Sequence, residues 1–240
     1  MALPRPFAYK RFSLCLIIML NLEYMWGLLP VLLRYLPLTL QMATIAMFFA
    51  LILACLLAVV RVSKVPFLNG FSLLFISFFR GTPLLVQLFL FYYGLPQLIS
   101  ALISITGVTA AVLGLTLHFS AYMAESIRAA IVGIDRSQTE AALSIGMTQS
   151  QLMRRIILPQ ATRVATPTLM NYFIDMIKAT SLAFTLGVTE LMGATQKEAA
   201  GSFLYLEAFL LVALIYWAIV EVLSWGQRRL EIYLNKAYQR

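Results

Sequence analysis

Uncharged apolar runs divide this chain into segments long enough to cross a lipid bilayer as helices. The hydrocarbon core of a bilayer is about 30 Å thick and takes roughly 20 helical residues. The run 81–124 is long enough for two such helices, and we divide it because GLPQ at 94–97 and Thr106-Gly107 interrupt it. The sequence therefore predicts an all-α, polytopic transmembrane bundle with about five spanning helices, placed at 35–60, 82–98, 108–131, 164–189 and 203–225.

Two further apolar segments are shorter than a full span. Segment 66–79 precedes Arg80-Gly81-Thr82-Pro83, which interrupts any continuous helix, so it either lies flat at the interface or begins the second span. Segment 12–20 follows basic residues as in a signal peptide, but no A-x-A cleavage site follows it. We expect an uncleaved anchor, or a start site placed upstream of the true one.

The beginning of the chain leaves two topologies open. We treat 1–33 as an N-terminal extension or a possible extra membrane segment, and 34–240 as a single transmembrane domain. If 12–33 crosses as a sixth helix, Glu23 lies near its centre, where an acidic side chain costs about 2.5 to 3.5 kcal/mol on insertion scales.

The composition is that of a membrane protein. Of the 240 residues, 61% are hydrophobic and 12% are charged, and the mean hydropathy is +0.87. The formal net charge of +8 is compatible with nucleic-acid binding, but the basic residues form short clusters between apolar runs, which indicates membrane topology instead. Cys15 and Cys55 lie in apolar segments without C-x-x-C spacing, so we expect buried, inert thiols.

The distribution of Lys and Arg predicts the orientation. Segments 61–80 and 126–163 and the tail from 226 carry three, five and four basic residues, so we place them in the cytoplasm. Segment 94–107 carries none and 191–203 carries one, so these two face outside. The C-terminus is therefore expected in the cytoplasm.

A polar stretch, SQTEAALSIGMTQSQLMRRIILP, occupies 137–159 in the longest segment that we place in the cytoplasm. Ser137 and Glu140 form an S-x-x-E capping box, in which the hydroxyl accepts an early helical N–H and the Glu reaches back to the cap. Gly146 suits the left-handed position that follows a helix. These residues predict one short helix and a turn.

A second helix is expected to follow that turn. Thr148 and Gln151 repeat the capping box, and Pro159 is expected to end the helix. Arg154 and Arg155 give it a charged surface. The stretch is therefore either a docking element for a partner or a plain solvated loop.

The spacing of this stretch, E-A-A-x3-G-x9-I-x-L-P, resembles the EAA loop of permease subunits in ABC importers. FFRGTPLLVQLFLFYYGLP (78–96), AYMAESIRAAI (121–131) and NYFIDMIKATSLAFTLGVTEL (171–191) resemble the subfamily for polar amino acids, the relatives of histidine, glutamine, arginine and cystine permeases. The resemblance covers roughly residues 24–235 and implies a type I ABC importer permease-like fold.

The resemblance also implies partners and coupling residues. It implies a multi-pass subunit of the bacterial cytoplasmic (inner) membrane, in contact with membrane lipid, that forms a homo- or hetero-dimer and sits on an ABC ATPase dimer. A periplasmic or lipid-anchored binding protein delivers the substrate, and the ATPase binds ATP and Mg, so this chain needs no cofactor. In that family the EAA helix seats in a groove of the ATPase. By carry-over the coupling residues are Glu140, Ala141, Ala142, Gly146, Arg154, Arg155 and Pro159.

Two rows of polar side chains lie at membrane depth, one in 108–131 and one in 164–189. Each row has the spacing i, i+4, i+7, which places its members on one face of a helix. Ionisable groups inside a bilayer usually face the bundle interior or a watered cavity. The candidate substrate-pathway residues are His118, Tyr122, Glu125, Asn171, Asp175, Lys178 and Ser181.

Several of these residues also have a purely structural interpretation. Asp175 and Lys178 either neutralise each other between packed helices or contact the ligand. Glu125 is expected to pair with Arg128, in a structural or gating role. His118 is either a hydrogen-bonded core histidine or a ligand contact.

The sequence predicts a transport subunit without an enzymatic activity of its own. No G-x-x-x-x-G-K-[ST] motif is present, so ATP hydrolysis must come from a separate subunit. A single histidine and the absence of G-x-S-x-G argue against an intramembrane enzyme, and we predict no catalytic or metal-binding residue. The alternative to an ATP-driven, alternating-access importer of a polar amino acid is an ion-coupled secondary transporter, in which Asp175 and His118 carry protons.

Overall fold

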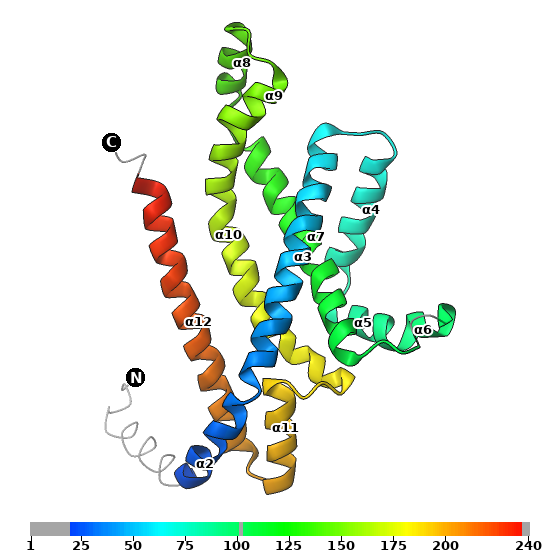
Figure 1. The fold of residues 1–240 in the computed structure, drawn as a ribbon, viewed down its shortest axis with the longest axis vertical. Coiled ribbons are helices and arrows are strands. Elements are labelled where there is room, and N and C mark those ends of the chain that lie inside the picture. The colour runs from blue at the N-terminus through cyan, green and yellow to red at the C-terminus, as the bar shows by residue number, and fades with distance from the viewer. Residues whose placement is uncertain (1–19, 101–102, 237–240) are drawn as a thin grey trace, which may run out of the picture.

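The computed structural model describes residues 20–100 and 103–236, which form a bundle of helices with no strand in those two ranges (Figure 1). Two π-helical segments, η1 (Leu90–Gly94) and η3 (Met153–Ile157), and one 3-10 segment, η4 (Thr180–Leu186), join some of the α-helices. The α-helices are α2 (Leu22–Leu33), α3 (Leu36–Ser63), α4 (Leu68–Gly81), α5 (Leu84–Phe89), α6 (Leu95–Leu98), α7 (Gly107–Val132), α8 (Arg136–Ser144), α9 (Gln149–Leu152), α10 (Leu158–Ala179), α11 (Leu191–Ser202) and α12 (Tyr205–Asn235). The predicted all-α transmembrane class is confirmed.

Within the described residues, three helices are long and apolar enough to cross a membrane: α3, α7 and α12. They contain the predicted spans 35–60, 108–131 and 203–225, apart from one residue at the start of the first and two at the start of the last. A fourth span is formed if the bent pair of α4 with the segment 84–98 is counted as one. α10 has 22 residues and packs along α7 but is more polar, and it ends at Ala179, well before the predicted end of its span.

The second predicted span is not a straight helix. The sequence placed it at 82–98, whereas α4 ends at Gly81 and the following helical segment is turned by 109°. Pro83 causes this break, because proline lacks an N–H and disfavours a helical conformation in the residue before it. Thr82 accordingly has extended angles, φ −117° and ψ 146°. Segment 66–79 forms most of α4, and a bend of this size is that of a broken span or of a re-entrant loop.

The described part of the N-terminal segment does not span a bilayer. α2 has 12 residues, which gives it a length of about 18 Å, short of the 30 Å core. Leu28 and Leu32 are buried against α11 and α12, and the backbone N–H of Asn21 donates to Glu207 Oε1 at 3.2 Å. Segment 12–20 and Cys15 lie outside the described residues, except for Leu20. The prediction of a buried thiol is wrong for Cys55, which is exposed on α3 because the neighbouring helices pack against the other face of α3.

A stripe of alanines holds α3 against α7. Ala43, Ala46, Ala50 and Ala54 are each 0% exposed, and they pack against buried side chains of α7. Small side chains let two helix backbones approach closely, which is how helices associate in a membrane without a hydrophobic driving force between them. α3 and α7 therefore form the rigid centre of the bundle.

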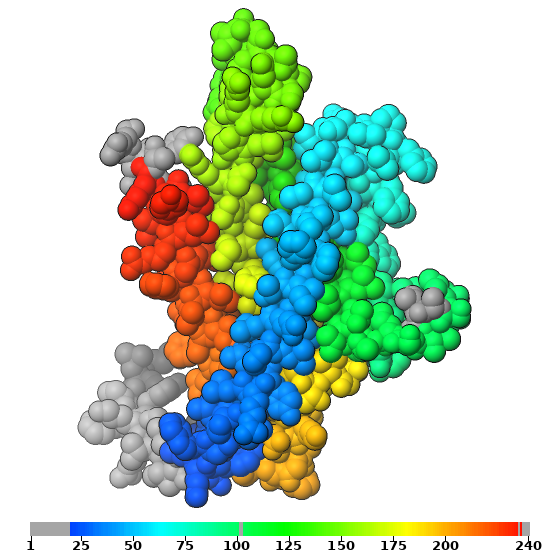
Figure 2. Space-filling model, viewed as in Figure 1, coloured from blue at the N-terminus to red at the C-terminus, as the bar shows by residue number. Residues whose placement is uncertain are grey.

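Two groups of short helices lie at opposite ends of this centre. α2 and α11 cover one end, and α8 and α9 project beyond the long helices at the other (Figures 1 and 2). We refer to these as the α2–α11 end and the α8–α9 end.

Gly193 is required where α11 begins. A Cβ at this position would lie 2.4 Å from the carbonyl oxygen of Val188, which belongs to the backbone and cannot rotate away. We expect Gly193→Ala to lower the free energy of unfolding by about 1 to 3 kcal/mol, measured by thermal unfolding in detergent. Gly201→Ala on the same helix is the control, because nothing lies within 4 Å of its Cβ position. Equal stability of the two variants would contradict the prediction.

Candidate functional site

The segment at the α8–α9 end has a defined helix-turn-helix geometry. Gly146 has φ +81°, so the predicted left-handed turn is present. The predicted capping box at Thr148 is also present, with Gln151 N–H donating to its hydroxyl and Gln151 Oε1 accepting its N–H at 2.9 Å. The first cap differs from the prediction, because Asp135, not Ser137, caps α8.

Asp135 takes the cap because its carboxylate reaches the Ser137 N–H at 2.9 Å. This hydrogen bond lowers the pKa of Asp135, since it stabilises the charged form. α8 therefore starts at Arg136, and Glu140 is not used as a capping residue.

Pro159 does not end the second helix, as the sequence analysis expected. It lies in the first turn of α10, where a missing N–H is tolerated, and the helical path continues from α9 through η3 into α10. The π-helical turn η3 ends at Ile157, two residues before the proline. Its wider hydrogen-bond spacing replaces the regular α-helical bonds just before Pro159, which itself has no N–H to donate. The coupling segment is thus a direct continuation of an intramembrane helix.

The coupling residues fall into a buried group and an exposed group. Ala142 is buried with Leu152 and Ile157, and this contact fixes α8 on the base of α10. Gln160 Nε2 donates to Gln138 Oε1 at 2.6 Å across the same contact. The other predicted coupling residues are all exposed: Glu140, Ala141, Gly146, Arg154, Arg155 and Pro159.

The exposed surface of α8 is suited to a protein partner. Ile145 is 80% exposed and Leu143 is 42% exposed, although this segment carries a polar sequence typical of water-facing structure. A pocket of about 350 Å³ lies between this segment and the base of α7, and both Arg136 and Glu140 line it. Apolar side chains next to a pocket with charged walls are a pattern of interfaces.

The break between α4 and α5 is stabilised by one buried amide. Gln87 is 1% exposed, and its Nε2 donates to Phe79 O at 3.0 Å, to Thr82 O at 3.1 Å and to Thr82 Oγ1 at 2.8 Å. The carbonyls that lose their helical partners at the break are therefore satisfied by a side chain. The Oε1 of Gln87 lies 3.1 Å from His118 Nδ1, so this ring nitrogen carries the proton and donates.

We expect Gln87→Leu to destabilise the protein by about 2 kcal/mol, because two buried carbonyls lose their donor while side-chain volume is kept. Thermal unfolding in detergent measures the change. Gln97→Leu is the matched control, since the Gln97 amide donates to Tyr93 O on an exposed surface. A loss of the same size in both variants would show that the buried position of Gln87 is unimportant.

The first polar row of the sequence is assembled around aromatic rings. The His118 and Tyr122 rings lie 5.1 Å apart, and the Tyr122 hydroxyl donates to Arg80 O at 3.3 Å. The Arg80 guanidinium stacks 5.4 Å from the Tyr122 ring centre. Tyr172 of α10, which the sequence analysis did not single out, lies against Tyr122 and hydrogen-bonds Ser126 at 3.0 Å.

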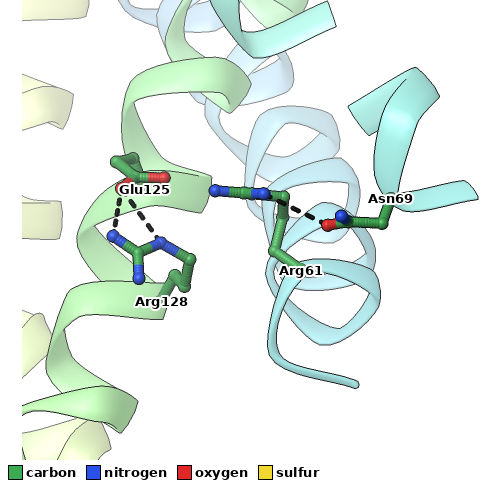
Figure 3. Close-up of polar contacts among 4 residues, drawn as sticks. All are labelled: Arg61, Asn69, Glu125 and Arg128. Atoms are coloured by element: carbon green, nitrogen blue, oxygen red, sulfur yellow. Dashed lines mark hydrogen bonds and ion pairs between the residues drawn. The ribbon is translucent and has the colours of Figure 1, made fainter. Parts of the chain in front are cut away.

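Glu125 pairs with Arg128, in agreement with the prediction. Arg128 Nε donates to Glu125 Oε1 at 2.9 Å, and a second guanidinium nitrogen contacts the same oxygen. Figure 3 shows that the side chain of Arg61 on α3 points toward this pair. Its Nη1 donates to Asn69 Oδ1 of α4 at 3.1 Å. The Glu125–Arg128 pair lies within α7 and the Arg61–Asn69 hydrogen bond joins α3 to α4 beside it, which is compatible with a structural or gating role.

The second polar row lies on the surface of the chain. Asp175 and Lys178 form an ion pair at 2.7 Å, and each side chain is 52% exposed. Asn171 Oδ1 accepts from Gln227 Nε2 of α12 at 3.1 Å. Ser181 is partly buried in η4.

The two rows do not meet within one chain. In the part that the structure describes, no hydrogen bond or ion pair joins His118, Tyr122 or Glu125 to the row on α10. On α10, Tyr172 and Ile177 pack toward α7, whereas the charged row faces away from α7. A charged row exposed at membrane depth needs water or another chain to cover it, because lipid tails solvate no charge.

Sequence reasoning missed a buried carboxylate at the α2–α11 end. Glu190 is 0% exposed and caps α11, with Gly193 N–H donating to Oε1 at 2.8 Å. Oε2 accepts from Thr39 Oγ1 at 3.2 Å and from the Tyr216 hydroxyl at 3.3 Å. The carboxylate therefore ties α3, α11 and α12 together. A lone acidic residue directly before an apolar segment was the available signal.

Comparisons with known proteins identify this architecture. The chain matches the family described as binding-protein-dependent transport system inner membrane component over residues 46–232. It is similar to the probable amino-acid ABC transporter permease protein PatM of Vibrio harveyi, with 64% identity over 92% of this chain and 99% of that protein. The probable amino-acid permease protein YxeN of Bacillus subtilis (strain 168) is 48% identical over 90% of this chain and 97% of that protein.

A solved structure shares the fold. The crystal structure of an amino acid ABC transporter with histidines matches with a TM-score of 0.83 and 32% identity, over 89% of this chain and 98% of that chain. The family match covers more than half of the chain, and the apolar spanning helices are those expected of an inner membrane component. This protein therefore belongs to the family of binding-protein-dependent transport system inner membrane components.

Proposed function

We propose that this chain is the permease subunit of an ATP-driven importer that moves a polar amino acid across the cytoplasmic membrane by alternating access. The observation that carries the proposal is the projecting α8–α9 segment, with exposed Glu140, Ile145 and Arg154 on a helix-turn-helix that the chain itself does not cover. Such a surface needs a partner, and in this family the partner is an ATPase.

The path from that surface into the membrane is short. α8 is fixed to the base of α10 by Ala142 and by the Gln138–Gln160 hydrogen bonds. α10 then continues without a loop to Asp175 and Lys178. We infer that a movement of the docked ATPase passes through α8 into α10 and displaces the charged row, which is the requirement for coupling.

The α8–α9 end is the cytoplasmic end in this proposal, and the C-terminus lies on the same side. The basic residues support this orientation, because Arg136, Arg154 and Arg155 are all exposed at that end. A substrate-binding protein then docks at the α2–α11 end, from the outer side of the membrane.

The charged row on α10 supports the choice of an amino acid as substrate. A zwitterion carries one positive and one negative group a few ångströms apart, and the Asp175–Lys178 pair presents both charges on one exposed face. Two of the relatives are named as amino-acid permeases. A second permease chain, identical or homologous, is expected to enclose this face, with Asn171 and Ser181 as neutral hydrogen-bonding groups beside it.

Reconstitution tests the proposal against the secondary-transporter alternative. The chain is placed in liposomes with its ATPase and binding protein, and uptake of a panel of labelled polar amino acids is measured. We expect uptake that requires internal ATP and survives collapse of the proton gradient. Uptake by the chain alone that follows the proton gradient would replace this proposal with the alternative.

A further inference from the structure

An apolar groove runs along the bundle on the side away from the charged row. It has a volume of about 740 Å³ and lies between α2, α3, α10 and α12. Its lining is aliphatic or aromatic except for Thr44, whose hydroxyl donates to Leu40 O at 2.8 Å and so needs no external partner. A polar amino acid in this groove would lose its hydration without replacement, so the groove does not belong to the substrate path.

The position of the groove on α10 supports the same conclusion. Phe173 lines the groove, and residues two apart on a helix point about 160° away from each other. Asp175 is therefore on the opposite face of α10, whereas Asn171 reaches Gln227 of α12, one helical turn beyond the last groove residue of that helix, Leu223. If the charged row faces a second permease chain or a watered pathway, the groove faces the surrounding lipid.

The dimensions of the groove match one leaflet of a bilayer. Its wall on α12 extends from Leu211 to Leu223, which corresponds to about 18 Å along the helix. Half of a hydrocarbon core is about 15 Å. The groove starts at Leu29 and Leu33 of α2, at the α2–α11 end, and runs inward from there.

A basic residue stands in the sequence between two residues that line the start of the groove. Arg34 is exposed and lies between Leu33 and Leu36, both of which line the groove. Its guanidinium has no hydrogen-bond or ion-pair partner within the described ranges 20–100 and 103–236. Arginine is well suited to phosphate oxygens at this depth of a membrane. Trp26 of α2, 79% exposed, fits the interfacial position that such a headgroup occupies.

We propose that this groove is a phospholipid site, in which one acyl chain lies between α3 and α12 and the phosphate lies beside Arg34. The lipid fills the space that the divergence of α12 from α3 leaves open, and it holds α2 and α12 against the central helices. The site is distinct from the substrate path and independent of which amino acid is transported.

Native mass spectrometry of the purified full chain, titrated with palmitoyl-oleoyl phosphatidylglycerol, tests the proposal. We expect the unaltered chain to retain one tightly held phospholipid. Ala218→Trp fills the groove and is expected to lose this lipid, whereas Ala213→Trp, on the outward face of the same helix, keeps it. Leu214→Trp, a second groove position, serves if Ala218→Trp does not fold.

Arg34→Gln tests the headgroup contact. We expect about fivefold weaker binding of phosphatidylglycerol, the effect of one basic residue near a membrane surface. Unchanged lipid binding in Ala218→Trp overturns the proposal. It is equally overturned if Ala218→Trp abolishes association between two copies of the chain, measured by light scattering, because the groove then holds a second copy.

Discussion

Glu140→Lys is expected to abolish ATP-dependent uptake while the chain still inserts and folds normally. Glu140 is exposed and forms no side-chain hydrogen bond or ion pair within the described residues, so its replacement removes no contact that stabilises the fold. It lines the pocket beside Arg136, and a lysine there places two positive charges together at the proposed ATPase surface. Like charges at an interface cost several kcal/mol, so we expect roughly a hundredfold weaker association.

Co-purification of the ATPase from detergent extracts and amino-acid uptake in cells measure this effect. Glu198→Lys is the matched control for co-purification, because it reverses the charge of an exposed glutamate on α11, at the other end of the molecule. The ATPase should stay bound to the control and be lost from Glu140→Lys. If Glu140→Lys keeps its ATPase and its uptake, the α8–α9 segment is a solvated loop.

Glu190→Ala is expected to lower the free energy of unfolding by about 3 kcal/mol, which corresponds to roughly 10 °C in Tm for a chain of this size. Three donors lose their acceptor in a buried site: Gly193 N–H and the hydroxyls of Thr39 and Tyr216. Thermal unfolding in detergent measures the change. Glu190→Gln should lose much less, because its amide oxygen still caps α11 and its volume is kept.

A comparison of the pH dependence of stability between the unaltered protein and Glu190→Gln isolates the contribution of the Glu190 carboxyl group. Burial raises the pKa of Glu190, and the hydrogen bonds from Gly193, Thr39 and Tyr216 oppose this only in part. The folded state therefore holds the proton more tightly than the unfolded state, whose pKa is about 4.3. The resulting stability is fully present below that value and is lost as the pH rises through the folded pKa.

We accordingly expect the Tm of the unaltered protein, relative to that of Glu190→Gln, to fall as the pH is raised from about 4 to about 8. All other titrating groups are common to both proteins, so they cancel in the difference. A Tm difference that is constant over this range would show that Glu190 is ionised equally in both states. A larger effect for Glu190→Gln than for Glu190→Ala would contradict the capping role.

Much of the membrane architecture could be predicted because its signals are local. An uncharged run of the length of 35–60 has to bury its backbone polar groups in a helix, whatever it packs against. The turn at Gly146 and the cap at Thr148 depend on residues within a few positions of each other, and both are present. The pairing of Glu125 with Arg128, one helical turn apart, is local in the same way.

The candidate site was predicted only in part, because its remaining features depend on distant segments. The partner of His118 is Gln87, 31 positions away, and no spacing rule connects them. Glu190 contacts Thr39 across 151 positions, so its link to α3 has no local signature, unlike its capping of α11. The prediction that Pro159 ends the second helix was wrong. A proline disfavours a helix by its own local chemistry, but here the adjacent π-helical turn lets the helical path continue into α10.

The sequence by itself determined that this protein is a helical membrane protein with a helix-turn-helix segment at 137–159, because hydrophobic length, turn residues and capping residues act within one or two helical turns. Only the tertiary structure decided that the second span bends by 109°, that the α10 row is exposed and faces away from the α7 row, and that an apolar groove separates α12 from α3. Those features follow from how whole helices pack, and the rotation of one helix against another is fixed by contacts between residues far apart in the chain.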